Sequence, residues 1–343
     1  MKRSGKICPL TVNTSARCQT PTILTVRQTH NITTGIHHLL SSLISPFILI
    51  SNRIQSIVCI YTMAAPFSLH EPFKPRPTIL LQGDSLTQLC WEGWGAHLSN
   101  VFQRRADVVI RGFAGYNTTF YLNLPDETVF PGLVLDNNED QSKCCLVIVW
   151  FGANDAGLPG LADHHYVSLE KYQSNLHKLI DRIQSRTKCT RIMLMTPPPV
   201  HHEQRLIFQR QKYGDGATGV LERTLENTGK YAEACLQVAQ ERKLPCCDIY
   251  HSMQQNTEWD SFLHDGLHFS EVGHIWLGRT VVQSIQEAFP ELAVTADPRT
   301  GQYGNSASTC PSIPGNTDGP FHDEIDHTDV AKAFQNYRTS SAK

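Results

Sequence analysis

Short apolar runs alternate with longer amphipathic segments through the middle of this chain. The apolar runs are bounded by Gly, Pro or Asn, which is typical of strands buried in a parallel sheet. We therefore predict five strands, at Thr78–Gln82, Val108–Arg111, Cys144–Trp150, Arg191–Met195 and Cys246–Ile249.

Apolar residues recur at helical spacing between these runs. One such segment follows Ser168, a suitable N-cap, and two others span Ala217–Arg242 and Glu271–Phe289, the last between a Ser270 cap and a Pro290 stop. Strands joined by helical crossovers predict an α/β domain with three layers, α/β/α.

The two ends of the chain differ from this middle part. Residues 1–70 contain six Lys or Arg side chains and no Asp or Glu, which is unusual for a globular domain. Residues 297–320 are rich in Gly, Ser, Thr, Asn and Pro, a composition that does not support a core. We therefore predict a disordered N-terminal extension over 1–76, one domain over 77–290, and a mostly disordered tail over 291–343 with a short amphipathic helix at Thr328–Tyr337.

The N-terminal extension has three interpretations. If translation starts at Met63, whose Met-Ala-Ala-Pro context resembles an ordinary N-terminus, the upstream part is leader or isoform sequence and we expect a cytoplasmic protein. If residues 1–62 are translated, their basic and hydroxyl residues suit a mitochondrial transit peptide. The third interpretation is a structured element. We expect no membrane span, because no run reaches the roughly 18 apolar residues that a span needs.

Charge and cysteine content exclude several classes of function. A formal net charge of −2 gives no general attraction to nucleic acid. The eleven cysteines form no C-x-x-C pair, and their odd number favours buried free thiols in a reducing compartment over disulfides or a zinc site. The pairs His164-His165 and His201-His202 lie in polar loops, where we expect solvated side chains and not metal ligands.

The strongest chemical signal follows the first predicted strand. Gly83, Asp84 and Ser85 would turn the chain into a helix and place the Ser85 hydroxyl at the carboxyl edge of the sheet, where open α/β folds hold their sites. Gly83 permits a sharp turn, and the free N–H groups at a helix N-terminus suit a developing oxyanion. By itself, however, this tripeptide is more often an ordinary turn.

Three further segments follow other predicted strands. Gly115 can present a bare backbone N–H to a ligand, and the Asn154 amide is a neutral donor suited to an oxyanion. His268 lies three positions after Asp265, so the carboxylate can hold Nδ1 while Nε2 takes the Ser85 proton. A turn, an Asx cap and a surface salt bridge would explain these segments one by one, but their joint order favours one hydrolytic site.

Together these segments resemble the four signature blocks of the SGNH (GDSL-type) hydrolases. The blocks are GDSLTQ, RGFAGYNT, FGANDA and DGLHFSEVGH, and no position departs from the family pattern. Gln88, the Gly93-Trp94-Gly95 turn and Tyr231–Cys235 further resemble the isoamyl acetate-hydrolysing esterase group. The resemblance covers residues 77–289 and excludes both ends.

The resemblance implies a fold and a catalytic set. The fold would be a flavodoxin-like parallel sheet with strand order 2-1-3-4-5. Ser85 would be the nucleophile, His268 the general base and acid, and Asp265 the carboxylate that orients the imidazole. The oxyanion hole would comprise the N–H groups of Ser85 and Gly115 and the amide of Asn154.

The expected reaction is hydrolysis of a carboxylic ester through an acyl-enzyme, which needs no metal or organic cofactor. We expect a small-molecule, short-chain, acetate-type ester as substrate. Long connections at Tyr116–Lys143, Ala156–Val167 and Pro197–Gly216 surround the predicted site and are expected to form its acyl pocket, with Trp94, Leu158 and Pro198 as lining residues. The alternatives are a lysophospholipase or thioesterase, a carbohydrate O-deacetylase, and a non-catalytic interaction module that keeps the fold. No sequence feature indicates an oligomeric state.

Overall fold

The structure, a computed structural model, describes residues 76–135, 143–294, 296 and 325–334. Residues 1–75 lie outside this set, so the three interpretations of the N-terminal extension stay predictions. The same holds for most of the C-terminal tail. Its predicted helix is present as α11 (Val330–Ala333), which begins two residues later and ends earlier than the sequence pattern indicated.

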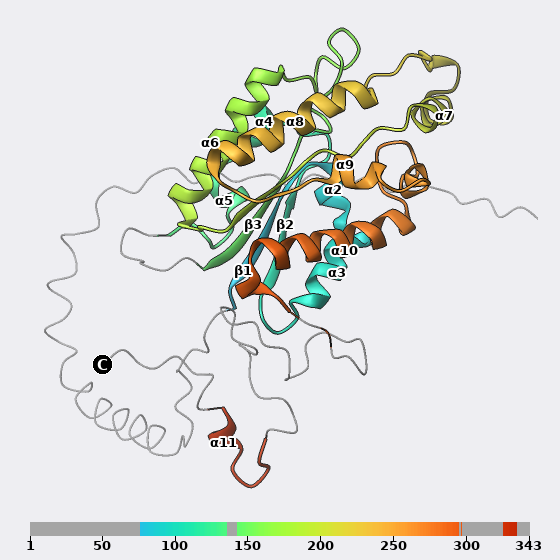
Figure 1. The fold of residues 1–343 in the computed structure, drawn as a ribbon. Helices are drawn as coiled ribbons and strands as arrows, with labels where there is room; N and C mark the ends of the chain where they lie inside the picture. The colour runs from blue at the N-terminus through green and yellow to red at the C-terminus, as the bar shows by residue number, and fades with distance from the viewer. Residues whose placement is uncertain (1–75, 136–142, 295, 297–324, 335–343) are drawn as a thin grey trace, which may run out of the picture. The chain divides into compact units, whose positions relative to one another are not determined.

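Five parallel strands form one sheet in the order β2-β1-β3-β4-β5 (Figure 1), as predicted. All five lie within two residues of their expected bounds: β1 (Thr78–Gly83), β2 (Asp107–Gly112), β3 (Cys144–Trp150), β4 (Ile192–Met195) and β5 (Cys246–Cys247). Strand β5 is the shortest because Asp248 already caps the following helix, accepting a hydrogen bond from the backbone N–H of His251.

Helices cover both faces of the sheet and complete the predicted three layers (Figure 1). Helices α3 (Trp94–Val101) and α10 (Glu271–Ala288) pack together on one face, and α6 (Leu169–Thr187) and α8 (Leu225–Arg242) pack together on the other. A hydrophobic core lies on each face of the sheet. Alternate residues of the buried strands contribute side chains to one core or the other, because successive side chains of a strand point to opposite faces. The shorter helices are α2 (Ser85–Gln88), α4 (Thr118–Leu122), α5 (Asp126–Val129), α7 (His202–Tyr213) and α9 (Ile249–Gln254), with 3-10 turns at Leu89–Glu92, Gly214–Gly216, Trp259–Phe262 and Pro290–Leu292.

Two of the predicted helix starts are confirmed by their caps. The Ser168 hydroxyl accepts a hydrogen bond from the Lys171 N–H at the start of α6. The Ser270 hydroxyl does the same for the Gly273 N–H at the start of α10. Each cap satisfies one of the backbone donors that a helix N-terminus leaves free.

The segment before α8 differs from its prediction. A helix was expected from Ala217, but α8 begins at Leu225 behind a Thr224 cap. Gly219 has a φ of +66°, a left-handed conformation that interrupts a helix. Conversely, the expected long connection over residues 197–216 contains the twelve-residue helix α7.

The described cysteines are free thiols, as predicted. All seven of those in the described part of the chain are unbridged, and only Cys246 is not fully buried. Among the described helices, none has the length and apolar character that a membrane crossing requires.

A glycine at the end of β2 gives a test of how tightly the sheet edge packs. A Cβ on Gly112 would lie 2.1 Å from the Gln88 nitrogen and 2.6 Å from the Thr87 carbonyl carbon, both backbone atoms. Gly112→Ala must therefore push β2 and α2 apart, and we expect urea unfolding to show a loss of about 1–3 kcal/mol. The control is Gly216→Ala, because nothing lies within 4 Å of a Cβ there. Equal stability of the two variants would contradict this packing.

Candidate active site

The turn after β1 presents one hydroxyl at the carboxyl edge of the sheet. Asp84 caps α2 through its Oδ1, which accepts a hydrogen bond of 2.9 Å from the Leu86 N–H. Ser85 is the first residue of α2. Gly83 allows the turn because a Cβ there would lie 2.6 Å from the Trp150 carbonyl oxygen, leaving no room for a side chain.

Ser85, His268 and Asp265 form a hydrogen-bonded chain. The Ser85 Oγ lies 3.0 Å from Nε2 of His268, and Nδ1 of the same ring lies 2.8 Å from Oδ2 of Asp265. A carboxylate only accepts, so Nδ1 carries the hydrogen and Nε2 is the acceptor for the serine hydroxyl. The local contact expected from the three-residue spacing is therefore present.

The environment of Asp265 keeps its carboxyl ionised. Burial alone would raise its pKa, but the hydrogen bond and charge of His268 and the N–H of Leu267 lower the pKa well below its ordinary value. Gly266 adopts a φ of +81° between them, and a Cβ there would lie 2.5 Å from the His201 carbonyl oxygen. The turn does not follow β5 directly, as the sequence suggested, because α9 and a 3-10 turn intervene.

One cavity of about 540 Å³ joins this chain to the predicted oxyanion donors. Ser85 and His268 line it together with Gly115 and Asn154, while Asp265 lies behind the imidazole with 3% of its side chain exposed. Gly115 has a φ of +77°, so its peptide is oriented in a way that other residues rarely adopt.

The Asn154 amide is held on both of its atoms. Its Nδ2 donates to the Tyr116 carbonyl oxygen at 3.0 Å, and its Oδ1 accepts from Nη2 of Arg223 at 3.0 Å. An amide nitrogen carries two hydrogens, so the contact with Tyr116 leaves a second one for a ligand.

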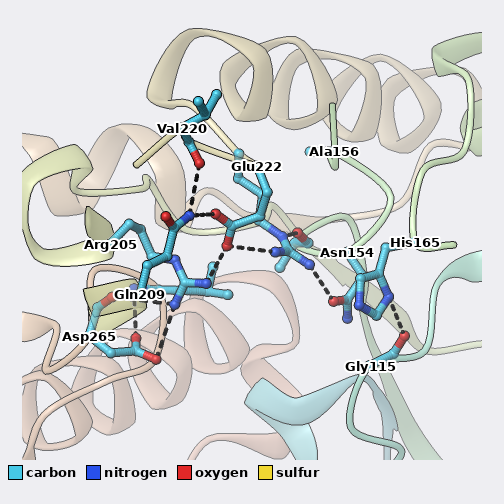
Figure 2. A network of polar contacts seen from close by, with 12 residues as sticks. Gly115, Asn154, Ala156, His165, Arg205, Gln209, Val220, Glu222 and Asp265 are labelled. Carbon is cyan, nitrogen blue, oxygen red and sulfur yellow. Dashed lines mark hydrogen bonds and ion pairs between the residues drawn. The ribbon is translucent and has the colours of Figure 1, made fainter. Parts of the chain in front are cut away.

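His165 corrects one expectation from the sequence, because it is not simply solvated. Its ring lines the cavity, and Nδ1 donates to the Gly115 carbonyl oxygen at 3.0 Å (Figure 2). Burial, assisted by the positive charge of Arg223, lowers the pKa of His165 to about 4. The ring is therefore neutral at neutral pH and holds the Gly115 carbonyl oxygen.

Three residues expected to line the pocket lie elsewhere. Trp94 is fully buried in the core, where its indole N–H donates to the Leu86 carbonyl oxygen and its ring meets Trp150 edge to face. Pro198 is buried, and Leu158 is half-buried with its N–H bonded to the Glu222 carbonyl oxygen. The described lining of the cavity includes none of the three.

Helix α7 and the segment after it supply the observed wall. Phe208 and Tyr213 come from α7, Val220 follows it, and Leu161 faces them from the connection after β3. Leu161, Tyr213 and Val220 are each about half exposed. The connections expected to form the pocket carry Leu161, Phe208 and Tyr213, but helix α7 and the contribution of Val220 were not predicted.

The sequence analysis also missed Arg205, Glu222 and Arg223, which line the cavity and contact one another. None belongs to the four signature blocks. The only local sign was Gly219, which breaks the expected helix and leaves Glu222 and Arg223 in a loop.

Two buried carboxyl groups lie under the site. Burial, assisted by the negative charge of the nearby Asp155, raises the pKa of Asp84 to about 7, although the hydrogen bond from the Leu86 N–H acts to lower it. Burial also raises the pKa of Asp155 to about 6, although the N–H and hydroxyl of Thr118 both donate to its Oδ1. Asp155 thereby ties the start of α4 to the segment that carries Asn154.

One group of side chains has the composition of a metal site. The ligand atoms of His264, Asp265 and His268 lie within 4.8 Å of one another. The hydrogen bond between Asp265 and His268 accounts for two of the three, so this arrangement is explained without a metal.

Comparison with known proteins identifies the family. The profile of the GDSL-like Lipase/Acylhydrolase family matches residues 81–275, more than half of the chain. A GDSL esterase/lipase of Arabidopsis thaliana is 35% identical over 266 residues, which cover 76% of this chain and 99% of the relative. The isoamyl acetate-hydrolyzing esterase 1 homolog of Homo sapiens is 34% identical over 244 residues, covering 64% of this chain and 93% of the relative.

A solved structure is also similar to part of this chain. The crystal structure of the lipase/acylhydrolase from Enterococcus faecalis has a TM-score of 0.46 and 25% identity, covering 62% of this chain and 96% of that chain. The chain belongs to the GDSL-like Lipase/Acylhydrolase family. It is a carboxylic-ester hydrolase, as its signature blocks predicted.

The titration of Asp84 gives a pH-dependent prediction. Folding raises its pKa from 3.8 to about 7, so between these values the native protein holds a proton that the unfolded chain releases. This contribution to stability is therefore lost as the pH rises through the window. Asp84→Asn removes the titration and keeps an oxygen acceptor for the Leu86 N–H.

We expect the stability of Asp84→Asn relative to wild type to increase from about pH 5 to about pH 8, as measured by urea unfolding at each pH. A difference between the two proteins that stays constant over this range would show that Asp84 is ionised throughout it.

Proposed function

We propose that this esterase hydrolyses small, short-chain carboxylic esters of the acetate type through an acyl-enzyme on Ser85. The observation that carries this proposal is the chain from Ser85 through His268 to Asp265, which opens into a cavity of about 540 Å³. A cavity of this volume is in the range of small-molecule sites.

The geometry supports a two-step acyl transfer. Ser85 Oγ attacks the ester carbonyl carbon while its proton passes to Nε2 of His268, and Asp265 stabilises the imidazolium that forms. The imidazolium returns this proton to the leaving alkoxide, and the acyl-enzyme remains. A water molecule then gives a proton to His268 and attacks the acyl carbon. His268 returns that proton to the Ser85 oxygen as the bond to the acyl carbon breaks, which releases the acid and restores the enzyme.

The oxyanion of each tetrahedral intermediate would be held by the N–H groups of Ser85 and Gly115 and the second Nδ2 hydrogen of Asn154. A single good donor of this kind contributes about 3 kcal/mol of transition-state stabilisation. The Asn154 donor is set before substrate arrives, because both atoms of its side-chain amide are already held by neighbours.

The preference for short acyl groups is supported by the charge of the cavity wall. Arg205, Glu222 and Arg223 all line the cavity that contains Ser85. A long acyl chain laid against them would desolvate charged groups without an apolar partner, which is unfavourable. Similarity to the isoamyl acetate-hydrolyzing esterase 1 homolog points in the same direction.

A lysophospholipase or thioesterase is the second candidate. The half-exposed Leu161, Tyr213 and Val220 at the same cavity give apolar surface on which a longer chain could lie. The two candidates share one mechanism and differ only in the dependence of rate on acyl length.

Hydrolysis of p-nitrophenyl esters from acetate to palmitate tests the proposed substrate class. We expect kcat/KM to be highest for the shortest acyl groups and to fall as the chain lengthens. An optimum at long chains would favour the second candidate, and folded protein without activity on any ester would leave a deacetylase or a binding module.

Replacement of the nucleophile provides the matched control. Ser85→Ala removes one oxygen at the first position of α2, so we expect an unchanged circular dichroism spectrum and loss of turnover by at least about 10³-fold. Residual activity above a few per cent of wild type would contradict the assignment of Ser85.

Asn154→Ala tests the oxyanion donor. Since the amide would interact most strongly with the tetrahedral intermediate, we expect kcat to fall by roughly 10²–10³ with little change in KM. A change confined to KM would mean that Asn154 only positions the substrate.

A further inference from the structure

A network of three charged side chains connects the Asp265 carboxylate to the Asn154 amide (Figure 2). Arg205 lies on α7, and Glu222 and Arg223 lie in the loop before α8. Their side chains are 8%, 19% and 6% exposed. Charges removed from water in this way are retained only where they are well paired.

Arg223 holds the oxygen side of the oxyanion donor. Its Nε donates to the Ala153 carbonyl oxygen at 2.8 Å, and its Nη2 donates to Oδ1 of Asn154 at 3.0 Å. The opposite amide orientation would place the NH₂ group of Asn154 against a guanidinium, which has no acceptor. Arg223 therefore selects the orientation in which Nδ2 contacts Tyr116 and faces away from the guanidinium.

Glu222 holds Arg223 in place. Its Oε1 accepts from Nη1 of Arg223 at 3.2 Å and from Nη2 of Arg205, and its Oε2 accepts from Nε2 of Gln209 at 2.6 Å. Burial acts to raise the pKa of Glu222, but the hydrogen bonds and charges of the two arginines lower it overall. One carboxylate thus separates two guanidinium groups that would otherwise repel each other.

Arg205 extends the network to the other side of the site. Its Nη1 lies 3.3 Å from Oδ2 of Asp265 and 3.4 Å from the Asp265 carbonyl oxygen. The same Oδ2 accepts the hydrogen bond from His268. A continuous set of contacts therefore runs from Asp265 through Arg205, Glu222 and Arg223 to Asn154.

We propose that Arg223 is a positioning residue that sets the Asn154 amide for the oxyanion, and that Glu222 and Arg205 brace it against the turn that carries Asp265. The proposal rests on the proposed function, since it assigns Arg223 a role through the oxyanion donor. It goes beyond the four signature blocks, because all three charged residues come from the segment between β4 and α8.

A double-mutant cycle separates this role from a merely structural one. The four proteins are wild type, Arg223→Gln, Asn154→Ala and the double variant, assayed on p-nitrophenyl acetate. If Arg223 acts through Asn154, its replacement loses its effect once the amide is gone.

We expect Arg223→Gln alone to lower kcat by about 10- to 100-fold with KM within about threefold of wild type. In the Asn154→Ala background, the same replacement should lower kcat by less than about threefold. A loss of the same factor in both backgrounds would overturn the proposal.

A replacement of Glu222 tests the same role from the carboxylate that holds Arg223. Glu222→Gln is nearly isosteric, removes the charge that holds Arg223 and replaces one acceptor oxygen with an NH₂ group, so we expect a kcat loss of about 3- to 10-fold that also disappears in the Asn154→Ala background. This variant carries the test if Arg223→Gln does not fold, and an undiminished loss in that background would equally overturn the proposal.

The matched control is Arg182→Gln on α6. Arg182 also donates to a carboxylate and two backbone carbonyls, those of Asp126, Leu122 and Leu124, but it does not line the cavity. We expect a lower Tm with kcat unchanged. If Asn154→Ala itself leaves kcat intact, the oxyanion role in the proposed function fails, which is a different outcome from additivity in the cycle.

Discussion

The site depends on how closely the chain approaches itself at the carboxyl end of β1, where Ser85 begins α2. The Gly83 backbone lies against the Trp150 carbonyl of β3, and the Gly112 backbone lies against the Thr87–Gln88 peptide at the end of α2. A side chain at either glycine would separate the elements. Because neither is present, α2 can start at the sheet edge and hold Ser85 within 3.0 Å of His268.

The carboxyl groups around this turn differ in charge because their surroundings differ. Asp265 has an imidazole and backbone N–H groups as donors, so its pKa is lowered in spite of burial. Asp84 is fully buried with a backbone donor on Oδ1, and burial prevails there. The Asp265 carboxylate that orients His268 is thus ionised at neutral pH. The pKa of Asp84, the residue before Ser85, lies near 7.

Local patterns in the sequence were enough for the sheet and for the contact between Asp265 and His268. Buried strands appear as apolar runs, caps such as Ser168 are adjacent to the helices they start, and a three-residue spacing fixes what a turn can bring together. The strand order and the grouping of Ser85 with Gly115 came from the family resemblance, which the fold bears out.

Long-range contacts account for what sequence analysis did not predict. Arg223 meets Asn154 across 69 positions of sequence, and Arg205 meets Asp265 across 60. No spacing rule links such residues, so a charged side chain in a polar segment looked like surface. Trp94 was expected in the pocket but lies in the core. An aromatic residue near the nucleophile suits either place equally well in sequence, and only tertiary packing decides between them.

Covalent labelling by an organophosphonate tests the central claim, that Ser85 is a nucleophile activated by His268, most directly. Intact mass and peptide mapping should show one adduct per chain on Ser85, no adduct in Ser85→Ala, and much slower labelling in His268→Ala. Folded wild-type protein that takes no label, or that takes it on another residue, would contradict the acyl-transfer mechanism.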